Sequence, residues 1–481
     1  MMRRSVEGKL LSWKNYDRRK PLVLLGMRRC GKTFILTEFG KNHFEDYVCF
    51  DFERNPRLAD VFHDLDPKRI LKELSSFRGR MITKDTLIIF DGIQHCYPAL
   101  TSLKYLGEEL PDYHVVCAGS LLGLALAGRE RRDKPGWKTS FPVGKVDFIR
   151  MWPMDFGEFV LAVKGEEYFG ALNDISAEDP LPEWMISDLN DLYIDYLVVG
   201  GMPEAVQTWM DTGDAEEVRR IQRDIIRSFK EDMGKYSGEN YQRISALWDS
   251  AAYQVAEAGN RFNLKKAGGT TRILDNSIQW LLDADFLRRT WEVNDDSIPP
   301  NPRGGIYFKL YLPDTGLLTC MAGISRQTLM SKDESTSKVR GAVAENYVLI
   351  QMSSSLGIEG DTYFWTNPKG DAEIDFQLMR SMTIVPVEVK SGEVGRMRSL
   401  ETYCEKYSPK EVLVISNRNT RIHKGGGIHL RTAVHGMETG NVSEASGTLT
   451  SAGPHRIETS HAVALTILPD IGKSADTSVM P

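Results

Sequence analysis

The stretch Leu24–Phe34 reads LLGMRRCGKTF and contains a loop of the form Gly-x-x-x-x-Gly-Lys-Thr. It follows an apolar run and precedes residues with helical spacing, which is the strand–loop–helix context of a P-loop. Glycines let backbone N–H groups wrap phosphates, while Lys32 adds a charge and Thr33 completes the shell of a Mg²⁺ ion. The residues expected to bind ATP are Gly26, Arg28, Arg29, Cys30, Gly31, Lys32 and Thr33.

The stretch Leu87–Gln94, LIIFDGIQ, predicts the second half of this site. Four apolar residues run into Asp91, a carboxylate expected to hold Mg²⁺ at the end of a buried strand. The next position, where many ATPases carry an acid, is Gly92. Because glycine cannot polarise the attacking water, the sequence predicts tight binding of Mg-ATP with slow hydrolysis. Gln94 and Asp51 are the polar residues that could substitute.

Other side chains could act on the γ-phosphate. Ser120 ends the strand-like run VVCAGS and either faces the γ-phosphate and attacking water or caps the following helix. Cations for a transition state could come from Arg28 and Arg29 in the loop, or from a second cluster in GRERRDK. That second cluster consists of Arg129, Arg131 and Arg132.

Length and composition set the broad class. A chain of 481 residues is too long for one core, so two or three domains are expected. The apolar fraction of 41% and the charged fraction of 26% are typical of a soluble globular protein, and the net charge of −6 gives no global basic field. Apolar runs are too short to span a bilayer, and the N-terminus predicts an amphipathic helix rather than a signal peptide. Six cysteines without a CxxC pair favour a reducing cytoplasm over a disulfide framework or a zinc site.

Five motifs, GMRRCGKT, IIFDGIQ, CAGSLLGL, WPMDFGEF and GGMPEAV, occur in this order. With them the chain resembles a prokaryotic family of AAA-type ATPases in which a C-terminal domain related to restriction-endonuclease folds follows the ATPase. The resemblance covers residues 5–425; the P-loop is generic, and the later motifs are specific. Family members usually read Asp-Glu-Ile-Gln where this chain reads Asp91-Gly92-Ile93-Gln94, and Gly-Arg where it reads Gly144-Lys145.

The C-terminal half also matches the family, in LYLPDTGLL with Asp314, GAVAENYV, AEIDF and VEVKSG. The resemblance implies a PD-(D/E)xK nuclease fold, with candidate catalytic residues Glu345, Asp375, Glu388 and Lys390. Glu388 and Lys390 are two residues apart, so on a strand they point to the same face. Asp375 and Glu388 could bind Mg²⁺, with Glu345 as a third carboxylate, while Lys390 orients or deprotonates water. Alternatively, the acids pair with Lys390 structurally and the fold has lost the chemistry.

The helix in TRILDNSIQWLLDADFL precedes a short β-like run, as the recognition helix of a winged helix does. This region contains few basic residues. Two roles are therefore compatible with the sequence, recognition of DNA and packing within the protein. The basic residues of this region are Arg261, Lys265, Lys266 and Arg272.

The predicted fold is α/β, with a parallel P-loop NTPase sheet, a central helical or winged-helix region and a C-terminal PD-(D/E)xK-like domain. The expected ranges are 1–150 for the AAA-like core, 151–215 for a helical lid, 216–300 for the winged-helix-like region, 301–425 for the C-terminal domain and 426–481 for a disordered or weakly packed tail. The tail differs so sharply in composition that an altered reading frame is conceivable.

The predicted function is a switch that binds ATP and Mg²⁺ and acts on DNA or on a protein partner, with an oligomer compatible with this role. One alternative is a signalling ATPase whose C-terminal domain binds protein partners. Another is an ATP-regulated, Mg²⁺-dependent nuclease.

Overall fold

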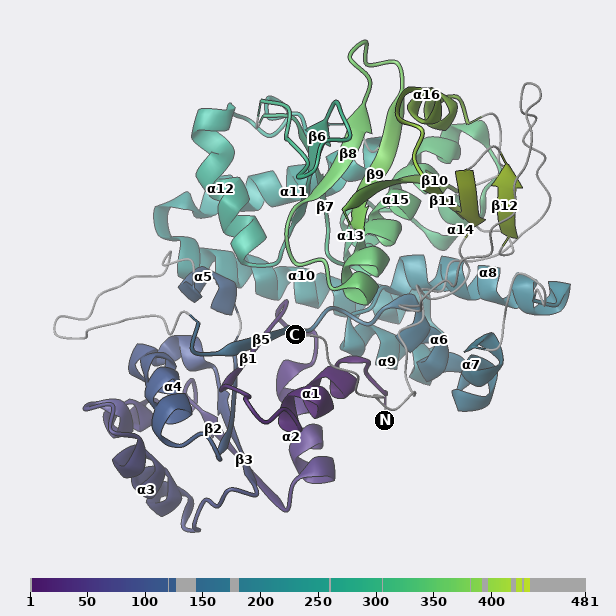
Figure 1. The fold of residues 1–481 in the computed structure, drawn as a ribbon. Helices are drawn as coiled ribbons and strands as arrows, with labels where there is room; N and C mark the ends of the chain where they lie inside the picture. The colour runs from purple at the N-terminus through teal and green to yellow at the C-terminus, as the bar shows by residue number, and fades with distance from the viewer. Residues whose placement is uncertain are drawn as a thin grey trace.

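The computed structural model describes residues 2–119, 121–126, 144–173, 181–258, 261–304, 306–380, 382–391, 397–416, 421–425 and 428–432. The predicted roles of Ser120 and of the arginines at 129, 131 and 132 fall outside these residues, as does the predicted tail from residue 433 onward. A first sheet with its helices, a helical layer and a second sheet follow one another along the chain (Figure 1).

The first sheet has five parallel strands in the order β2-β3-β4-β1-β5. Its strands are β1 (Leu22–Leu25), β2 (Asp46–Asp51), β3 (Thr86–Asp91), β4 (His114–Ala118) and β5 (Asp147–Arg150). Its helices are α1 (Val6–Lys14), α2 (Lys32–His43), α3 (Pro67–Arg78) and α4 (Tyr97–Glu109), with 3-10 turns η1 (Pro56–Phe62) and η2 (Ile93–His95).

Both faces of this sheet are buried, which explains why its strands are almost wholly apolar. Ile88 and Phe90 share a core with α3 and α4, whereas Leu87 and Ile89 share another with α1 and α2. The predicted α/β architecture with a parallel sheet is therefore confirmed for the N-terminal part of the chain.

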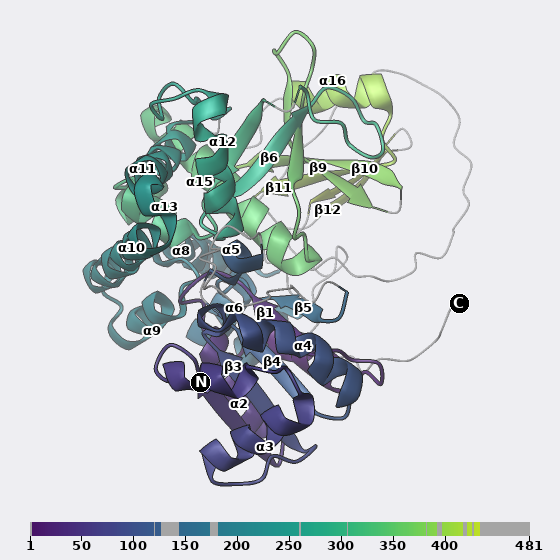
Figure 2. The same cartoon turned by 90° about the vertical axis from the view of Figure 1, so that its left-hand side faces the viewer.

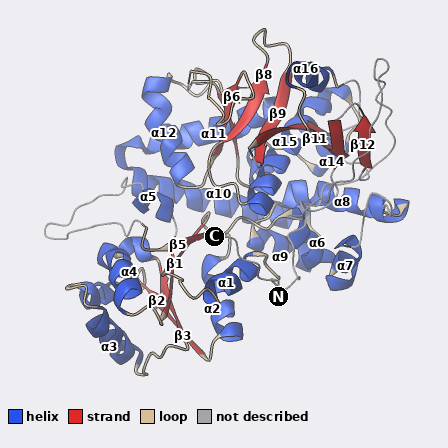
Figure 3. Ribbon diagram, in the orientation of Figure 1, coloured by secondary structure: helices blue, strands red, loops and turns tan. Residues whose placement is uncertain are grey.

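A layer of helices lies between this sheet and the second one and continues along the side of the second sheet (Figures 1 and 3). It comprises α5 (Leu122–Leu126), α6 (Phe156–Lys164), α7 (Glu166–Asn173), α8 (Glu183–Val199), α9 (Pro203–Thr212), α10 (Ala215–Ser237), η3 (Gly238–Asn240), α11 (Tyr241–Ala258) and α12 (Thr271–Asp283). Among the residues that the structure covers, no helix combines the length and apolarity needed to cross a bilayer.

The second sheet has eight strands in the order β12-β13-β11-β10-β9-β8-β6-β7. They are β6 (Arg288–Val293), β7 (Phe308–Tyr311), β8 (Thr362–Thr366), β9 (Glu373–Arg380), β10 (Thr383–Lys390), β11 (Glu411–Ser416), β12 (Arg421–Gly425) and β13 (Ile428–Thr432). The accompanying helices are α13 (Thr315–Met321), α14 (Arg326–Met330), α15 (Glu334–Leu356) and α16 (Arg398–Tyr407). One face of the sheet shares a large core with α15 and the helical layer, and the other packs on α16 (Figure 2).

Two predicted boundaries differ from the observed strand pairing. β6 pairs in parallel with β8 and antiparallel with β7, so the range 216–300 ends inside the second sheet rather than before it. Likewise, β13 pairs with β11 and β12, so the first residues of the predicted tail extend the sheet. These strands are short and their partners are distant in the sequence, so no local pattern indicates the pairing.

Candidate nucleotide-binding site

The P-loop connects β1 to α2, as the sequence predicts. The backbone takes positive φ values at Gly26 (137°), Arg29 (63°) and Gly31 (97°). A Cβ atom at Gly26 would lie 2.1 Å from the carbonyl oxygen of Met151, so this position requires glycine for space as well as for conformation. At the start of the loop, the backbone after β1 thus lies very close to the backbone of the residue that follows β5.

Lys32, the first residue of α2, lies against the loop itself. Its side chain is buried, and its Nζ donates to the carbonyl oxygens of Gly26 at 2.7 Å and Met27 at 2.8 Å. The ammonium group is therefore held within the curve of the loop, where a phosphate-binding lysine is needed.

The two residues predicted to hold magnesium are in direct contact. Thr33 Oγ1 donates to Asp91 Oδ2 at 2.8 Å, and the N–H of Gly92 donates to Asp91 Oδ1 at 3.0 Å. Burial raises the pKa of Asp91 above its ordinary value, although both hydrogen bonds oppose the shift. A hydroxyl and a carboxylate at one sheet edge are the hard oxygen donors that suit Mg²⁺.

Gly92 adopts a left-handed conformation, with φ 64° and ψ 31°. A Cβ atom there would lie at ordinary contact distance from His95 Cδ2 (3.5 Å) and Glu53 Cβ (3.8 Å). Space is thus available for a side chain, but the backbone conformation favours glycine. No sequence pattern connects Glu53 with this position.

Of the two residues predicted to substitute for position 92, Asp51 is engaged in a local turn, whereas Gln94 Oε1 is buried without a hydrogen-bond partner. Asp51 Oδ1 accepts the N–H groups of Glu53 and Arg54, each at 2.9 Å. Gln94 is buried, and its Oε1 would lie 2.1 Å from a Cβ atom at Gly119, so its amide points toward the end of β4.

The two arginines of the loop contact the helical layer. Arg28 forms an ion pair with Asp232 of α10, and Arg29 Nη1 lies 3.3 Å from Glu204 Oε2 of α9. Burial raises the pKa of Asp232 although Arg28 opposes the shift, and its Oδ2 is buried without a hydrogen-bond partner. Both predicted phosphate ligands are therefore links between the P-loop and α9–α10 in this structure.

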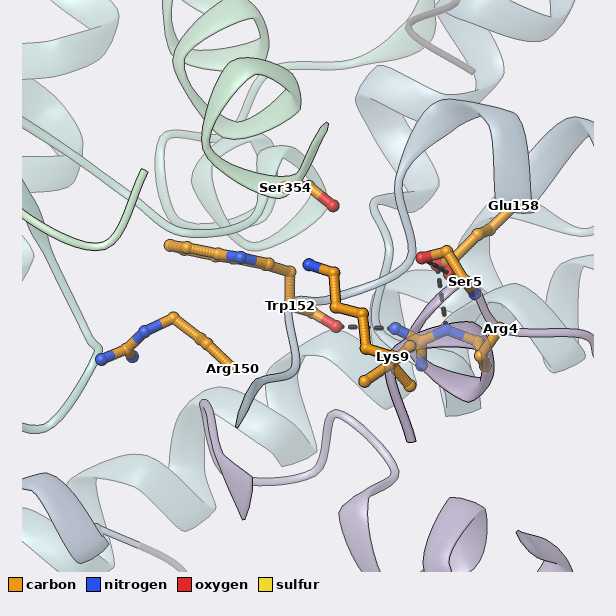
Figure 4. A pocket seen from close by; sticks show the side chains of 8 residues that line it. Arg4, Ser5, Lys9, Arg150, Trp152, Glu158 and Ser354 are labelled. Carbon is orange, nitrogen blue, oxygen red and sulfur yellow. Dashed lines mark hydrogen bonds and ion pairs between the residues drawn. The ribbon is translucent and has the colours of Figure 1, made fainter. Parts of the chain in front are cut away.

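Arg4 connects the loop to α6 (Figure 4). Its guanidinium donates to the carbonyl oxygens of Cys30 at 3.0 Å and Trp152 at 2.7 Å, and to Glu158 at 2.9 Å. A small pocket here is also lined by Lys9 and Arg150, but not by the threonine–aspartate pair. Every nitrogen of the Arg4 guanidinium donates to a protein acceptor. This arginine therefore stabilises the P-loop and is not a ligand-binding residue.

Three of the motifs meet at a buried junction. The N–H of Met154 donates to the carbonyl oxygen of Gly201 at 2.7 Å, and the N–H of Gly201 donates to Asp314 Oδ2 at 2.6 Å. Asp314 also caps α13 by accepting the N–H of Leu317 at 2.8 Å. Burial raises the pKa of Asp314 to about 6 despite these hydrogen bonds. The motifs WPMDFGEF, GGMPEAV and LYLPDTGLL therefore hold the domains together at this point.

Three of the predicted nuclease residues lie on the second sheet and Glu345 lies on α15, and β7 adds a lysine that the motif does not contain. Lys309 Nζ lies 2.7 Å from Glu345 Oε1 and 2.7 Å from Glu373 Oε1. Tyr311 also donates to Glu345 through its hydroxyl group. Both contacts fall on Oε1 of Glu345, and its role as a third metal ligand stays a prediction.

Asp375, Glu388 and Lys390 lie on adjacent strands. Lys390 Nζ lies 2.5 Å from Glu388 Oε1, and Asp375 Oδ2 accepts the N–H of Val389 at 2.7 Å. Burial and the charges of Glu388 and Glu345 raise the pKa of Asp375 well above its ordinary value. Glu388 Oε2 is buried without a hydrogen-bond partner. Within the described ranges, no group of three or more His, Cys, Asp or Glu residues could hold a metal ion.

Three family models match successive parts of the chain. Residues 18–160 match an AAA domain. Residues 190–328 and 340–433 match two domains of unknown function, DUF8612 and DUF4143. No curated protein matches the chain. Together with the P-loop geometry, the first match shows that the chain carries an AAA-type P-loop ATPase domain.

Two solved structures are similar to this chain. The Walker-type ATPase PABY2304 of Pyrococcus abyssi is 15% identical, covers 67% of this chain and 96% of its own, and has a TM-score of 0.41. The signal transduction ATPase with numerous domains (STAND) PH0952 from Pyrococcus horikoshii, which has a tetratricopeptide repeat sensor, is 11% identical. It covers 72% of this chain and 48% of its own, with a TM-score of 0.24.

Proposed function

We propose that this protein is a Mg-ATP-dependent switch in which the P-loop controls the position of the helical layer. The observation that carries the proposal is the hydrogen bond between Thr33 and Asp91 beside a complete phosphate loop. Lys32 neutralises the triphosphate, and Thr33 and Asp91 hold Mg²⁺. The metal ion, when bound, neutralises charge on the β- and γ-phosphates.

The switch itself uses the loop arginines. Arg28 and Arg29 pair with Asp232 of α10 and Glu204 of α9, and a triphosphate in the loop competes with these carboxylates for the same cations. Binding of the nucleotide therefore loosens the connection between the loop and α9–α10. Slow hydrolysis at Gly92 keeps the protein in the ATP-bound state.

Hydrogen exchange of the full chain tests this switch. Saturating Mg-ATP should raise exchange in α9 and α10 of the wild type and leave a Lys32→Ala variant unchanged. A wild type that binds Mg-ATP with no change in these two helices would refute the switch while leaving the nucleotide site in place.

The target of the switch is a protein partner or DNA. DNA binding by the switch would depend on the basic residues near α12. However, Arg261 pairs with the buried Glu292, and Lys266 pairs with Glu257. This pairing favours a packing role for the region and hence a protein partner. Salt-dependent binding of duplex DNA would reverse that preference, because counterion release accompanies every phosphate contact.

A second candidate function is Mg²⁺-dependent cleavage of nucleic acid by a PD-(D/E)xK-like C-terminal domain. The observation that favours it is the unpartnered, buried Oε2 of Glu388 beside Lys390 and Asp375. Cleavage of plasmid or branched DNA in Mg²⁺ that is lost in Lys390→Ala would support it. Absence of cleavage by the wild type, with and without ATP, would leave the domain as an interaction module.

A further inference from the structure

The strand register brings a second acid to position 92. β2 and β3 are paired in parallel with Asp51 opposite Asp91, and the N–H of Phe52 donates to the carbonyl oxygen of Asp91 at 3.0 Å. The pairing thus continues one residue beyond β2, so that the next residue, Glu53, leaves the sheet alongside Gly92. A Cβ atom at Gly92 would lie 3.6 Å from the Glu53 nitrogen and 3.8 Å from its Cβ atom.

Local hydrogen bonds present Glu53 at this edge. Asp51 accepts the N–H groups of the two residues at positions 53 and 54 and so fixes a tight Asx-type turn. The Glu53 side chain is 62% exposed, and its Oε1 lies 3.8 Å from Nζ of Lys235. In the part of the chain that the structure describes, its carboxylate accepts no hydrogen bond, so both oxygens are available to a water molecule.

We propose that Glu53 supplies the carboxylate that position 92 lacks and acts as the general base in ATP hydrolysis. This inference rests on the nucleotide site proposed above. The attacking water forms a bond from its oxygen to the γ-phosphorus while the bond from that phosphorus to the β–γ bridging oxygen breaks. ADP leaves with the electron pair on that oxygen, and the proton of the water passes to Glu53 and then to solvent. General-base assistance of this kind contributes roughly 10²–10⁴ in rate.

The same geometry links hydrolysis to the helical layer. Lys235 lies on α10, three residues after Asp232, which pairs with Arg28 of the loop. When α10 moves, Lys235 moves with it, and the electrostatic environment of the Glu53 carboxylate changes. Turnover is slow because the Glu53 carboxylate is paired with Lys235 and is therefore less available to take the proton of the attacking water.

Single-turnover hydrolysis of the full chain tests the role of Glu53, with Mg-ATP affinity measured for every variant. Glu53→Gln should lower the rate by about 100-fold at unchanged affinity. The matched control is Glu45→Gln, an exposed glutamate before the opposite end of β2, which should retain the wild-type rate. Lys235→Met removes the ion pair but keeps the carboxylate, and it should raise the rate.

A transplanted acid separates a catalytic role from a structural one. Gly92→Glu should raise the rate at least ~10-fold, and Glu53→Gln with Gly92→Glu should match Gly92→Glu alone, because the new carboxylate replaces the lost one. Gly92→Asn, which tolerates the left-handed backbone without adding an acid, should give no gain.

The outcomes distinguish this inference from the proposal on which it rests. A wild type that does not bind Mg-ATP contradicts the nucleotide site itself. A wild type that binds Mg-ATP overturns the role of Glu53 if it shows no hydrolysis, or if Glu53→Gln keeps its rate. A Glu53→Gln loss that Gly92→Glu does not rescue also overturns it, because Glu53 would then act only on the fold.

Discussion

Replacement of Lys309 by methionine should destabilise the second sheet strongly. The lysine side chain is 2% exposed and lies 2.7 Å from Glu345, which is 10% exposed, and 2.7 Å from Glu373, which is 42% exposed. Although burial opposes the charge, these two glutamates raise the pKa of Lys309 above its ordinary value. The variant therefore leaves at least one buried carboxylate without its cation.

The expected loss follows from burial. Removal of one partner of a buried ion pair costs about 3–5 kcal/mol, because the remaining charge is uncompensated. The pair with Glu345 dominates this cost, since Glu373 is reached by water. The matched control is Lys266→Met, whose partner Glu257 is 62% exposed and whose loss should cost only about 0–1 kcal/mol.

Urea unfolding followed by tryptophan fluorescence measures both losses. One of the nine tryptophans that contribute to this signal, the buried Trp365 of β8, lies in the sheet that contains the cluster. Addition of Glu345→Gln to Lys309→Met should recover part of the stability, because it removes the unpaired charge. A Lys309→Met loss below about 1 kcal/mol, equal to that of the exposed control, would refute the reasoning.

Two further predictions concern the buried junction between the domains. Because burial raises the pKa of Asp314 to about 6, the folded chain keeps this proton where the unfolded chain, with an ordinary pKa near 4, has lost it. The free energy of unfolding of the wild type relative to Asp314→Asn should therefore fall as pH rises from about 4 to about 6 and then level off; a rise over that window in urea titrations would contradict this. Gly201→Ala should lower the melting temperature, since a Cβ atom there would lie 1.9 Å from the carbonyl oxygen of Met154. The variant should bind Mg-ATP with wild-type affinity. An unchanged melting temperature would contradict the prediction, because the backbone at the junction would then shift to accommodate the new Cβ atom.

The sequence predicted the parts of the site that are continuous along the chain. Lys32 and Thr33 lie within one loop, and Asp91 ends an apolar strand, so local pattern and parallel-sheet geometry were sufficient to place them together. The left-handed backbone conformation of Gly92 could not be predicted from the sequence, because a glycine in a sequence does not reveal its φ angle.

Residues that act through pairing between distant segments were missed. Glu53 reaches position 92 only because β2 and β3 are in register with Asp51 opposite Asp91. Lys309 joins the acidic cluster from β7, which no nuclease motif includes. The pairing of β6 could not be predicted for the same reason, since its partner β8 follows about 70 residues later. Such contacts depend on register and topology, and no local pattern encodes them.

The central claim is that the loop between β1 and α2 binds Mg-ATP through Lys32, and calorimetry of the full chain tests it most directly. Mg-ATP should bind the wild type, and Lys41→Ala, an exposed lysine of the same helix, should bind equally well. Lys32→Ala should bind at least ~10-fold more weakly, because it removes a charged hydrogen-bond donor from the phosphates. Equal affinities in the wild type and Lys32→Ala, or no binding by the wild type, would contradict the account.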